Sequence, residues 1–164
     1  MRGRVWKFGD DISTDLIAPG RYYHLRSNLP ELARHVLEDA DPEFAAKVKA
    51  GDFVCAGRNF GLGSSREHAP AIIKMAGVGA VLARSFARIF FRNAINVGLP
   101  AIECDTAKFD AGDELEVDLE NGTIRDLTKD VTVAFHPLET AMRRILEDGG
   151  LVEHIKKHGD FAIS

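Results

Sequence analysis

A glycine-rich segment at residues 57–63 runs directly into Ser64, Ser65 and Arg66, and these residue types together could do chemistry on an anion. Glycines let a ligand approach the backbone closely. An arginine guanidinium can pair with a carboxylate through two parallel hydrogen bonds, and a serine beside positive charge can act as a base. Ser64 and Glu67 also fit a capping box, so we expect a helix to begin at Ser64 with its free amides directed toward this loop.

Other functions remain open for this segment. Arg66 stands where a dinucleotide-binding motif needs its third glycine, and the sequence has neither a P-loop nor the Gly-x-Ser-x-Gly elbow of hydrolases. One alternative is a capped helix whose loop only turns a corner. A second is a hydrolase in which His68 activates Ser64, although no third group that would orient the histidine is identifiable. A third is a non-catalytic module that binds anions.

A second polar segment, residues 10–20, combines three carboxylates with Ser13 and Thr14 before a Pro-Gly turn. Such a run is most often a solvated loop with side-chain-capped turns. Without a nearby histidine, its carboxylates would suit a hard cation at most. The aromatic and basic residues 21–28 that follow could equally be an ordinary surface loop.

The motif Gly-Ser-Ser-Arg-Glu-His-Ala at residues 63–69 resembles the swivelling-domain signature of the aconitase superfamily, as does Ser-Phe-Ala-Arg-Ile-Phe at residues 85–90 with Asn93. The resemblance covers most of the chain, from about Lys7 to the hairpin near Asn121, and the serine–arginine motif is its most specific part. Within the superfamily, the short chain is most similar to the small subunits of archaeal-type 3-isopropylmalate dehydratases.

The resemblance implies roles for five residues. Ser64 matches the catalytic base of the family, and Ser65 and Arg66 match residues that bind substrate. Asp15 matches an aspartate of the active-site hydrogen-bond network. Arg26 lies in the segment that matches the substrate-discriminating loop, where it would meet the variable end of the substrate. No metal ligand is expected in this chain.

Function, cofactor and partner follow from the same resemblance. We expect the small subunit of a two-chain hydro-lyase, 3-isopropylmalate dehydratase, which interconverts 2- and 3-isopropylmalate by dehydration and rehydration in leucine biosynthesis. The alternative is the small subunit of a homoaconitase or of a dimethylmalate- or citraconate-type hydro-lyase. The large subunit would carry a [4Fe-4S] cluster, this chain alone would bind no cofactor, and the assembly would be a heterodimer or heterotetramer.

The elements that must position these residues alternate between strands and helices. Apolar or alternating runs predict strands at residues 4–8, 52–56, 78–83, 99–104, 114–119, 123–127 and 131–135. Helical spacing predicts helices from residue 30, at 41–48, at 65–75, at 85–97 capped by Ser85, at 138–147 and at 152–158. Pro70 should bend the helix at 65–75 or shorten its first segment. Strand–helix–strand order favours parallel pairing in an α/β fold, and the resemblance implies a swivelling β/β/α-type three-layer domain with a mixed sheet.

Three arginines, Arg84, Arg88 and Arg92, recur at every fourth position. On a helix this spacing forms one stripe. We expect the stripe to face solvent or another subunit rather than the substrate.

Length and composition narrow the class of protein. A chain of 164 residues that is 45% hydrophobic can bury the core of one domain, spanning residues 1–164. The net charge of −4 gives no reason to expect nucleic acid or an anionic membrane as a partner. No apolar run approaches the ~20 residues of a membrane span and no signal-peptide core follows the polar start, so we expect a cytoplasmic protein. Cys55 and Cys104 are too few to ligate an iron–sulfur cluster and are expected to be buried thiols rather than a disulfide.

Overall fold

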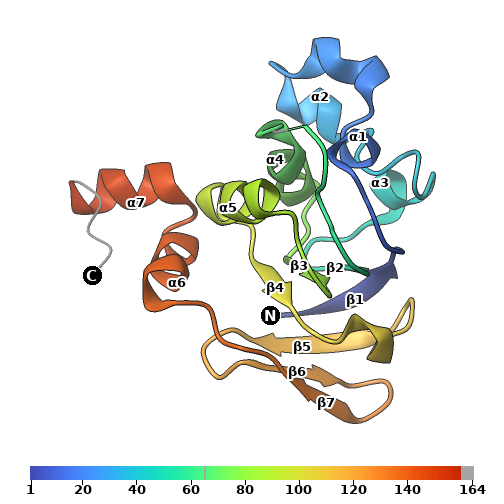
Figure 1. The fold of residues 1–164 in the computed structure, drawn as a ribbon, viewed down its shortest axis with the longest axis vertical. Helices are drawn as coiled ribbons and strands as arrows, with labels where there is room; N and C mark the ends of the chain where they lie inside the picture. Colours follow the sequence, from blue (N-terminus) through green and yellow to red (C-terminus); the bar gives the residue numbers. More distant parts are fainter. Residues whose placement is uncertain (65, 160–164) are drawn as a thin grey trace.

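The computed structural model describes residues 1–64 and 66–159, which form a seven-stranded mixed sheet with helices (Figure 1). The strand order is β4-β3-β2-β1-β5-β6-β7. Strands β1 to β4 pair in parallel, and β1, β5, β6 and β7 pair antiparallel, which confirms the predicted mixed sheet. The strands are β1 (Arg2–Lys7), β2 (Phe53–Ala56), β3 (Ala80–Ala83), β4 (Ala101–Glu103), β5 (Glu114–Asp118), β6 (Thr123–Asp126) and β7 (Val131–Ala134).

The helices are short, and most of them lie between the parallel strands in the sequence. They are α1 (Thr14–Ile17), α2 (Leu29–Ala33), α3 (Phe44–Lys47), α4 (His68–Met75), α5 (Arg88–Asn96), α6 (Thr140–Glu147) and α7 (Leu151–His158). Two 3₁₀ helices, Gly20–Leu25 and Thr106–Lys108, complete the set. The polar segment 10–20 therefore contains the short helix α1, which the sequence did not predict.

The side chains of the parallel strands alternate between the two faces of the sheet, and each face packs against a different layer. In β2, Val54 and Ala56 point into a core shared with the helices, whereas Phe53 and Cys55 point into a second core shared with β5 to β7. Figure 1 shows helices α1 to α5 above the parallel strands and β5 to β7 below them. Because both faces are covered, the parallel strands read as continuous apolar runs.

Helix α4 begins later than the sequence predicted. Its first residue is His68 and its N-cap is Glu67, which makes no side-chain capping bond, so the predicted capping box at Ser64 is wrong. The backbone at Ser64 is instead held by the hydroxyl of Thr14 across the site. Pro70 is the third residue of the helix, where its missing N–H is not needed, so the start at His68 agrees with the predicted shortening and a bend is not required.

Helix α5 also starts later, at Arg88, with Ala87 rather than Ser85 as its N-cap. Residues 85–87 are extended because they form a parallel bridge with Phe60, which donates to the Ser85 carbonyl at 3.0 Å and accepts from the Ala87 amide at 2.9 Å. The Ser85 hydroxyl accepts a hydrogen bond from the Asn59 amide. Arg84 therefore lies outside the helix, and the predicted arginine stripe is limited to two residues on α5.

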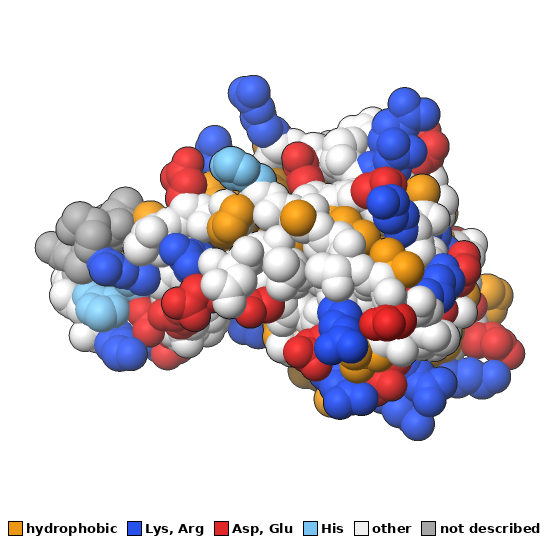
Figure 2. Space-filling view, turned by 90° about the horizontal axis from the view of Figure 1, so that it is seen from below, with side chains coloured by type: hydrophobic (Ala, Val, Ile, Leu, Met, Phe, Trp, Pro, Cys, Tyr) orange, Lys and Arg blue, Asp and Glu red, His pale blue; other side chains and the backbone are white. Residues whose placement is uncertain are grey.

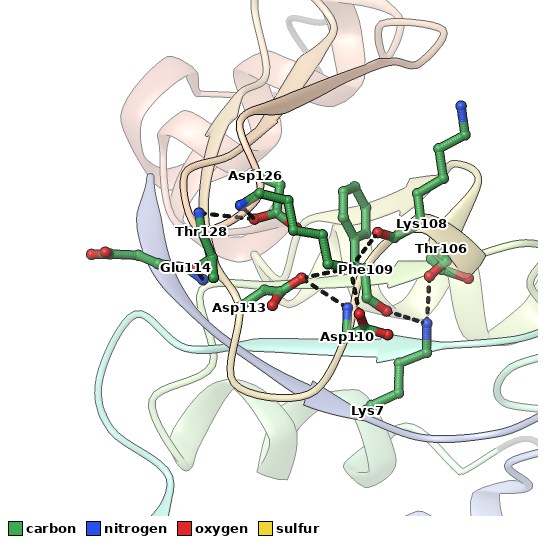
Figure 3. Close-up of polar contacts among 10 residues, drawn as sticks. Lys7, Thr106, Lys108, Phe109, Asp110, Asp113, Glu114, Asp126 and Thr128 are labelled. Carbon is green, nitrogen blue, oxygen red and sulfur yellow. Dashed lines mark hydrogen bonds and ion pairs between the residues drawn. The ribbon is translucent and has the colours of Figure 1, made fainter.

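Polar contacts tie the lower layer to β1 (Figure 3). The ammonium group of Lys7 donates to the carbonyls of Thr106 and Phe109. Lys129 in turn pairs with Asp110 at 2.5 Å and with Asp113 at 3.1 Å. These bonds hold the connection between β4 and β5 against β1, the strand that leads into the polar segment at residues 10–20.

The surface carries charges of both signs. Figure 2, seen from the end where β7 lies, shows separate hydrophobic side chains across the middle of this face, with acidic and basic groups around them. None of the described helices combines the length and the apolar character that a membrane-spanning helix needs.

Candidate active site

The segments that follow β1 and β2 run side by side. The Asp11 amide donates to the Arg58 carbonyl at 2.9 Å, and the Gly61 amide donates to the Ile12 carbonyl at 2.7 Å. Because β1 and β2 are parallel, their carboxyl ends meet at one edge of the sheet, which is where open α/β sheets bind ligands. The two polar segments that the sequence singled out separately therefore meet in one place.

The glycines of the loop are required chiefly by neighbouring protein atoms. A Cβ at Gly57 would lie 1.9 Å from the carboxylate of Asp10, which accepts a hydrogen bond from the next amide of the loop. Gly61 has a φ of +84°, and a Cβ there would lie 2.2 Å from the ring of Phe90. At both positions, protein rather than ligand occupies the space that the missing side chain leaves.

Ser64 is joined to the first segment through Thr14. The buried hydroxyl of Thr14 donates to the carbonyl oxygen of Ser64 at 3.0 Å. Thr14 is the first residue of α1, whose N-cap Ser13 accepts a hydrogen bond from the Leu16 amide. The Ser64 side chain is exposed, and its hydroxyl forms no hydrogen bond within residues 1–64 and 66–159, so it is available to a ligand. The neighbouring predicted residue Ser65 lies outside the described residues.

Arg66 lies against the same segment. Its Nη1 donates to the Ala18 carbonyl at 2.9 Å and lies 3.4 Å from Asp15 Oδ1. The Arg66 side chain is only 20% exposed, whereas Asp15 is exposed. These contacts engage one nitrogen of the guanidinium and leave its other donors for a carboxylate.

Tyr23 connects Arg26 to this site. The Arg26 guanidinium carbon lies 4.2 Å from the centre of the Tyr23 ring, and its Nη1 donates to the Tyr23 carbonyl at 3.1 Å. The guanidinium carbon of Arg66 lies 6.0 Å from the same ring, and the ring of His68 meets it edge-on at 6.3 Å. Burial, then the charges of Arg66 and Arg26, lower the pKa of His68, which favours the neutral form of this histidine. Tyr23 was not singled out by the sequence.

A cavity of about 170 Å³ lies beside Ser64 and Arg66. Its remaining lining comes from Thr14, Gly61 and Gly63 and from the start of α5: Ala87, Arg88, Ile89, Phe90 and Asn93. Asn93 was part of the motif noted in the sequence, but nothing there indicated that α5 would form a wall of this site. A free hydroxyl and a partly free guanidinium beside one open cavity can bind a carboxylate and move a proton next to it.

A hydrolase lacks support in this arrangement, because no described carboxylate forms a hydrogen bond with His68. Residues 1–64 and 66–159 provide no third group to orient the histidine toward Ser64. The expected role of His68 in that alternative is therefore unsupported.

A cluster of possible metal ligands lies elsewhere, at the turn between α6 and α7. It comprises Asp148, His154 and His158. Asp148 accepts from His154 Nδ1 at 2.6 Å, from His158 Nε2 at 3.0 Å and from Lys157 at 3.1 Å, so protein donors already occupy its carboxylate.

The two cysteines do not fit an iron–sulfur cluster. Both are free thiols, and burial raises the pKa of Cys55 and of Cys104 to about 12, which opposes the thiolate form that metal binding needs. Both pack in the second core, below the parallel strands.

Comparison with known proteins identifies the family. The sequence pattern of the aconitase C-terminal domain matches residues 18–107, which include the loop, α4 and α5. The chain belongs to the aconitase C-terminal domain family. This confirms the resemblance noted in the sequence, and it shows that the chain belongs with the aconitase-type swivelling domains.

Relatives of this aconitase-family chain match over nearly its whole length. The 3-isopropylmalate dehydratase small subunit 2 of Archaeoglobus fulgidus is 63% identical over 163 residues, covering 99% of each chain. The methanogen homoaconitase small subunit of Methanothermobacter thermautotrophicus is 57% identical over 166 residues, covering all of this chain and 95% of that one. The crystal structure of 3-isopropylmalate dehydratase (leuD) from Methanocaldococcus jannaschii superposes with a TM-score of 0.92 at 47% identity, covering 96% of this chain and 94% of the other. The predicted α/β swivelling fold is therefore confirmed.

Proposed function

We propose that this chain is the small subunit of a two-chain 3-isopropylmalate dehydratase, a hydro-lyase that interconverts isopropylmalates by dehydration and rehydration. The observation that carries the proposal is near-full-length similarity to small subunits of that name, at 54–63% identity. Tertiary contacts also support it, because they bring four residues together at one edge of the sheet: Ser64, Thr14, Arg66 and Asp15.

In this proposal Ser64 is the base. Its Oγ takes the proton from the carbon beside a substrate carboxylate during dehydration and returns a proton during rehydration. A serine hydroxyl is a weak base in water, so its deprotonated form needs stabilisation. The start of α4 cannot supply it as the sequence predicted, because that helix begins at His68. The guanidinium of Arg66, which lines the same cavity, can supply it.

In this proposal the arginines bind the substrate. Arg66 would hold a carboxylate with the donors that Ala18 and Asp15 leave free, and Ser65 would bind the substrate beside it. Arg26, held over Tyr23, would meet the variable end of the substrate.

The remaining parts of the reaction would come from a large subunit, in a cytosolic heterodimer or heterotetramer. That subunit would carry a [4Fe-4S] cluster, which supplies a Lewis acid for the substrate hydroxyl. The chain described here has only two cysteines, too few to hold the cluster.

Reconstitution tests this proposal. The purified chain, a large subunit of the same enzyme class and the mixture of both are assayed for hydration and dehydration of isopropylmalates under anaerobic conditions. We expect activity in the mixture only. Turnover of isopropylmalate by the isolated chain would contradict the two-chain proposal, and an inactive mixture with a cluster-loaded large subunit would contradict the substrate assignment.

Homoaconitase is the second candidate. Two observations favour it: the 57% identical homoaconitase small subunit and a positive charge at Arg26, which suits a substrate with an additional carboxylate. Higher kcat/KM of the same reconstituted pair on homoaconitate than on isopropylmalate would select this candidate.

A further inference from the structure

An apolar surface continues outward from the site cavity across the start of α5. A groove of about 330 Å³ lies there, and its apolar lining is Phe86, Phe91, Pro137, Leu138 and Met142. Arg88 lines both this groove and the site cavity, and Ile89 lines the site cavity beside it. We call these seven residues the α5 surface. The groove and the cavity therefore form one continuous surface rather than two separate features.

The α5 surface combines one exposed large apolar side chain with partly buried ones. Ile89 is 56% exposed although it lies at the edge of the candidate site. Phe86 and Phe91 are partly buried and contact each other at 5.7 Å between ring centres, which makes the apolar area continuous. Contiguous apolar area beside a polar site is typical of a protein-binding surface.

Unpaired positive charge lies on α5 and just before it, whereas two carboxylates, Glu103 and Glu139, line the groove itself. Arg84, Arg88 and Arg92 are exposed and form no ion pair or side-chain hydrogen bond with any residue that the structure describes. By contrast, Arg66 and Arg21 each have a carboxylate partner within the chain. The free guanidinium groups would be complemented by carboxylates on a partner.

We propose that the α5 surface is where the large subunit docks, through an apolar patch bordered by acidic residues. This inference rests on the proposed function and names the surface that the two-chain enzyme would use. Its position supports it: Arg88 lines both the groove and the site cavity, so a chain seated here would also close the open cavity beside Ser64.

A second copy of this chain is the less suitable occupant. A twofold contact brings the same patch of both copies together, so each copy would supply two carboxylates, Glu103 and Glu139, for three arginines. The excess positive charge opposes that contact, whereas an acidic border on a different chain would pair with all three arginines.

Binding measurements with single variants test the proposal. Calorimetry measures the dissociation constant for the large subunit with the wild-type chain, Ile89→Asp and Val152→Asp. Val152 is the control because it is an apolar residue on α7 that is 64% exposed. We expect Ile89→Asp to raise the dissociation constant at least about tenfold and Val152→Asp to leave it unchanged. Thermal unfolding of each variant shows that the chain remains folded.

Charge reversal provides an independent variant. Arg92→Glu lies outside the cavity lining, so it should weaken binding and reduce its salt dependence, whereas Lys156→Glu on α7 should do neither. If the wild-type chain binds the large subunit and both α5 variants bind equally well, the docking surface is wrong and the proposed function stands. If the folded wild-type chain does not bind a cluster-loaded large subunit, the two-chain function itself is wrong.

Discussion

The hydroxyl of Thr14 donates a hydrogen bond of 3.0 Å to the carbonyl of Ser64, fifty residues away in the sequence. This bond joins the first turn of α1 to the loop that carries the proposed base. Gly63 has no side chain here, and a Cβ at that position would lie 3.3 Å from the same hydroxyl. The Ser64 backbone is therefore positioned by tertiary contacts and not by the cap of its own helix.

Replacing Thr14 tests the importance of this bond. Thr14→Val keeps the shape of the side chain but removes the donor, so we expect a loss of about 1 kcal/mol in the free energy of unfolding and a larger proportional loss of kcat. Thr14→Ser, which keeps the hydroxyl, should retain most of the turnover. Denaturant unfolding and steady-state kinetics measure the two effects, and normal kcat in Thr14→Val would show that Ser64 does not depend on this bond.

The sequence predicted the strands well because their signal is local. Residues 52–56 and 114–119 are apolar or alternating runs, and the observed β2 and β5 lie within one residue of them. The order of the strands is not local. β1 pairs with β2 on one side and β5 on the other, which brings Trp6 beside Val54 and Gly3 beside Leu115.

The same distinction explains the errors at the helix starts and in the site. Ser64 and Ser85 have the residue type of an N-cap, but bonds to distant partners hold the backbone of each outside its helix. Ser64 and Arg66 could be identified because they share one motif. Tyr23 and Ile89 could not, because only the tertiary fold brings the 3₁₀ helix Gly20–Leu25 and the start of α5 beside that motif.

Ser64→Ala should abolish most turnover without affecting stability. The Ser64 hydroxyl has no partner in the described chain, so its removal should leave the melting temperature unchanged. A general base typically contributes ~10²–10⁴-fold to rate, and kcat should fall by about that factor. We expect Ser65→Ala to cost less. Near-normal kcat in the reconstituted Ser64→Ala enzyme would show that another group is the base.

Tyr23 should hold Arg26 close to His68. The pKa of His68 reports on the position of Arg26, and it can be measured on this chain alone. Because the Arg26 charge lowers the pKa of His68, Arg26→Gln should raise it. In a Tyr23→Ala background the same change should have no effect, since Arg26 would already extend into solvent. The four variants of this cycle are titrated by NMR, with Tyr23→Phe as the control that keeps the ring. Equal effects of Arg26→Gln in both backgrounds would contradict the positioning role of Tyr23.

Asp148 should make stability depend on acid pH. Hydrogen bonds from His154, then Lys157 and His158, lower the pKa of Asp148 from 3.8 to about 2. Since the folded-state pKa is depressed, its stabilising contribution is present above about pH 4 and is lost as the pH falls toward 2. Asp148→Asn should therefore lower the melting temperature at pH 6, and its difference from wild type should shrink between pH 4 and 2. Glu120→Gln, an exposed turn residue, serves as the control, and a difference independent of pH would contradict the ion-pair explanation.

Arg26 should decide between substrates that differ at their variable end. Leu25 packs against the helix-side core, whereas the Arg26 guanidinium lies over Tyr23 beside the site. If Arg26 binds a distal carboxylate, Arg26→Val should leave that charge unpaired and cost homoaconitate about 2–5 kcal/mol in kcat/KM, with little loss on isopropylmalate or citraconate. The measurement is kcat/KM of the reconstituted enzyme on each substrate, with Arg34→Val, an exposed arginine on the surface after α2, as the matched control. Equal losses on all substrates would assign Arg26 to the carboxylate that they share, and unchanged values would place it outside the site.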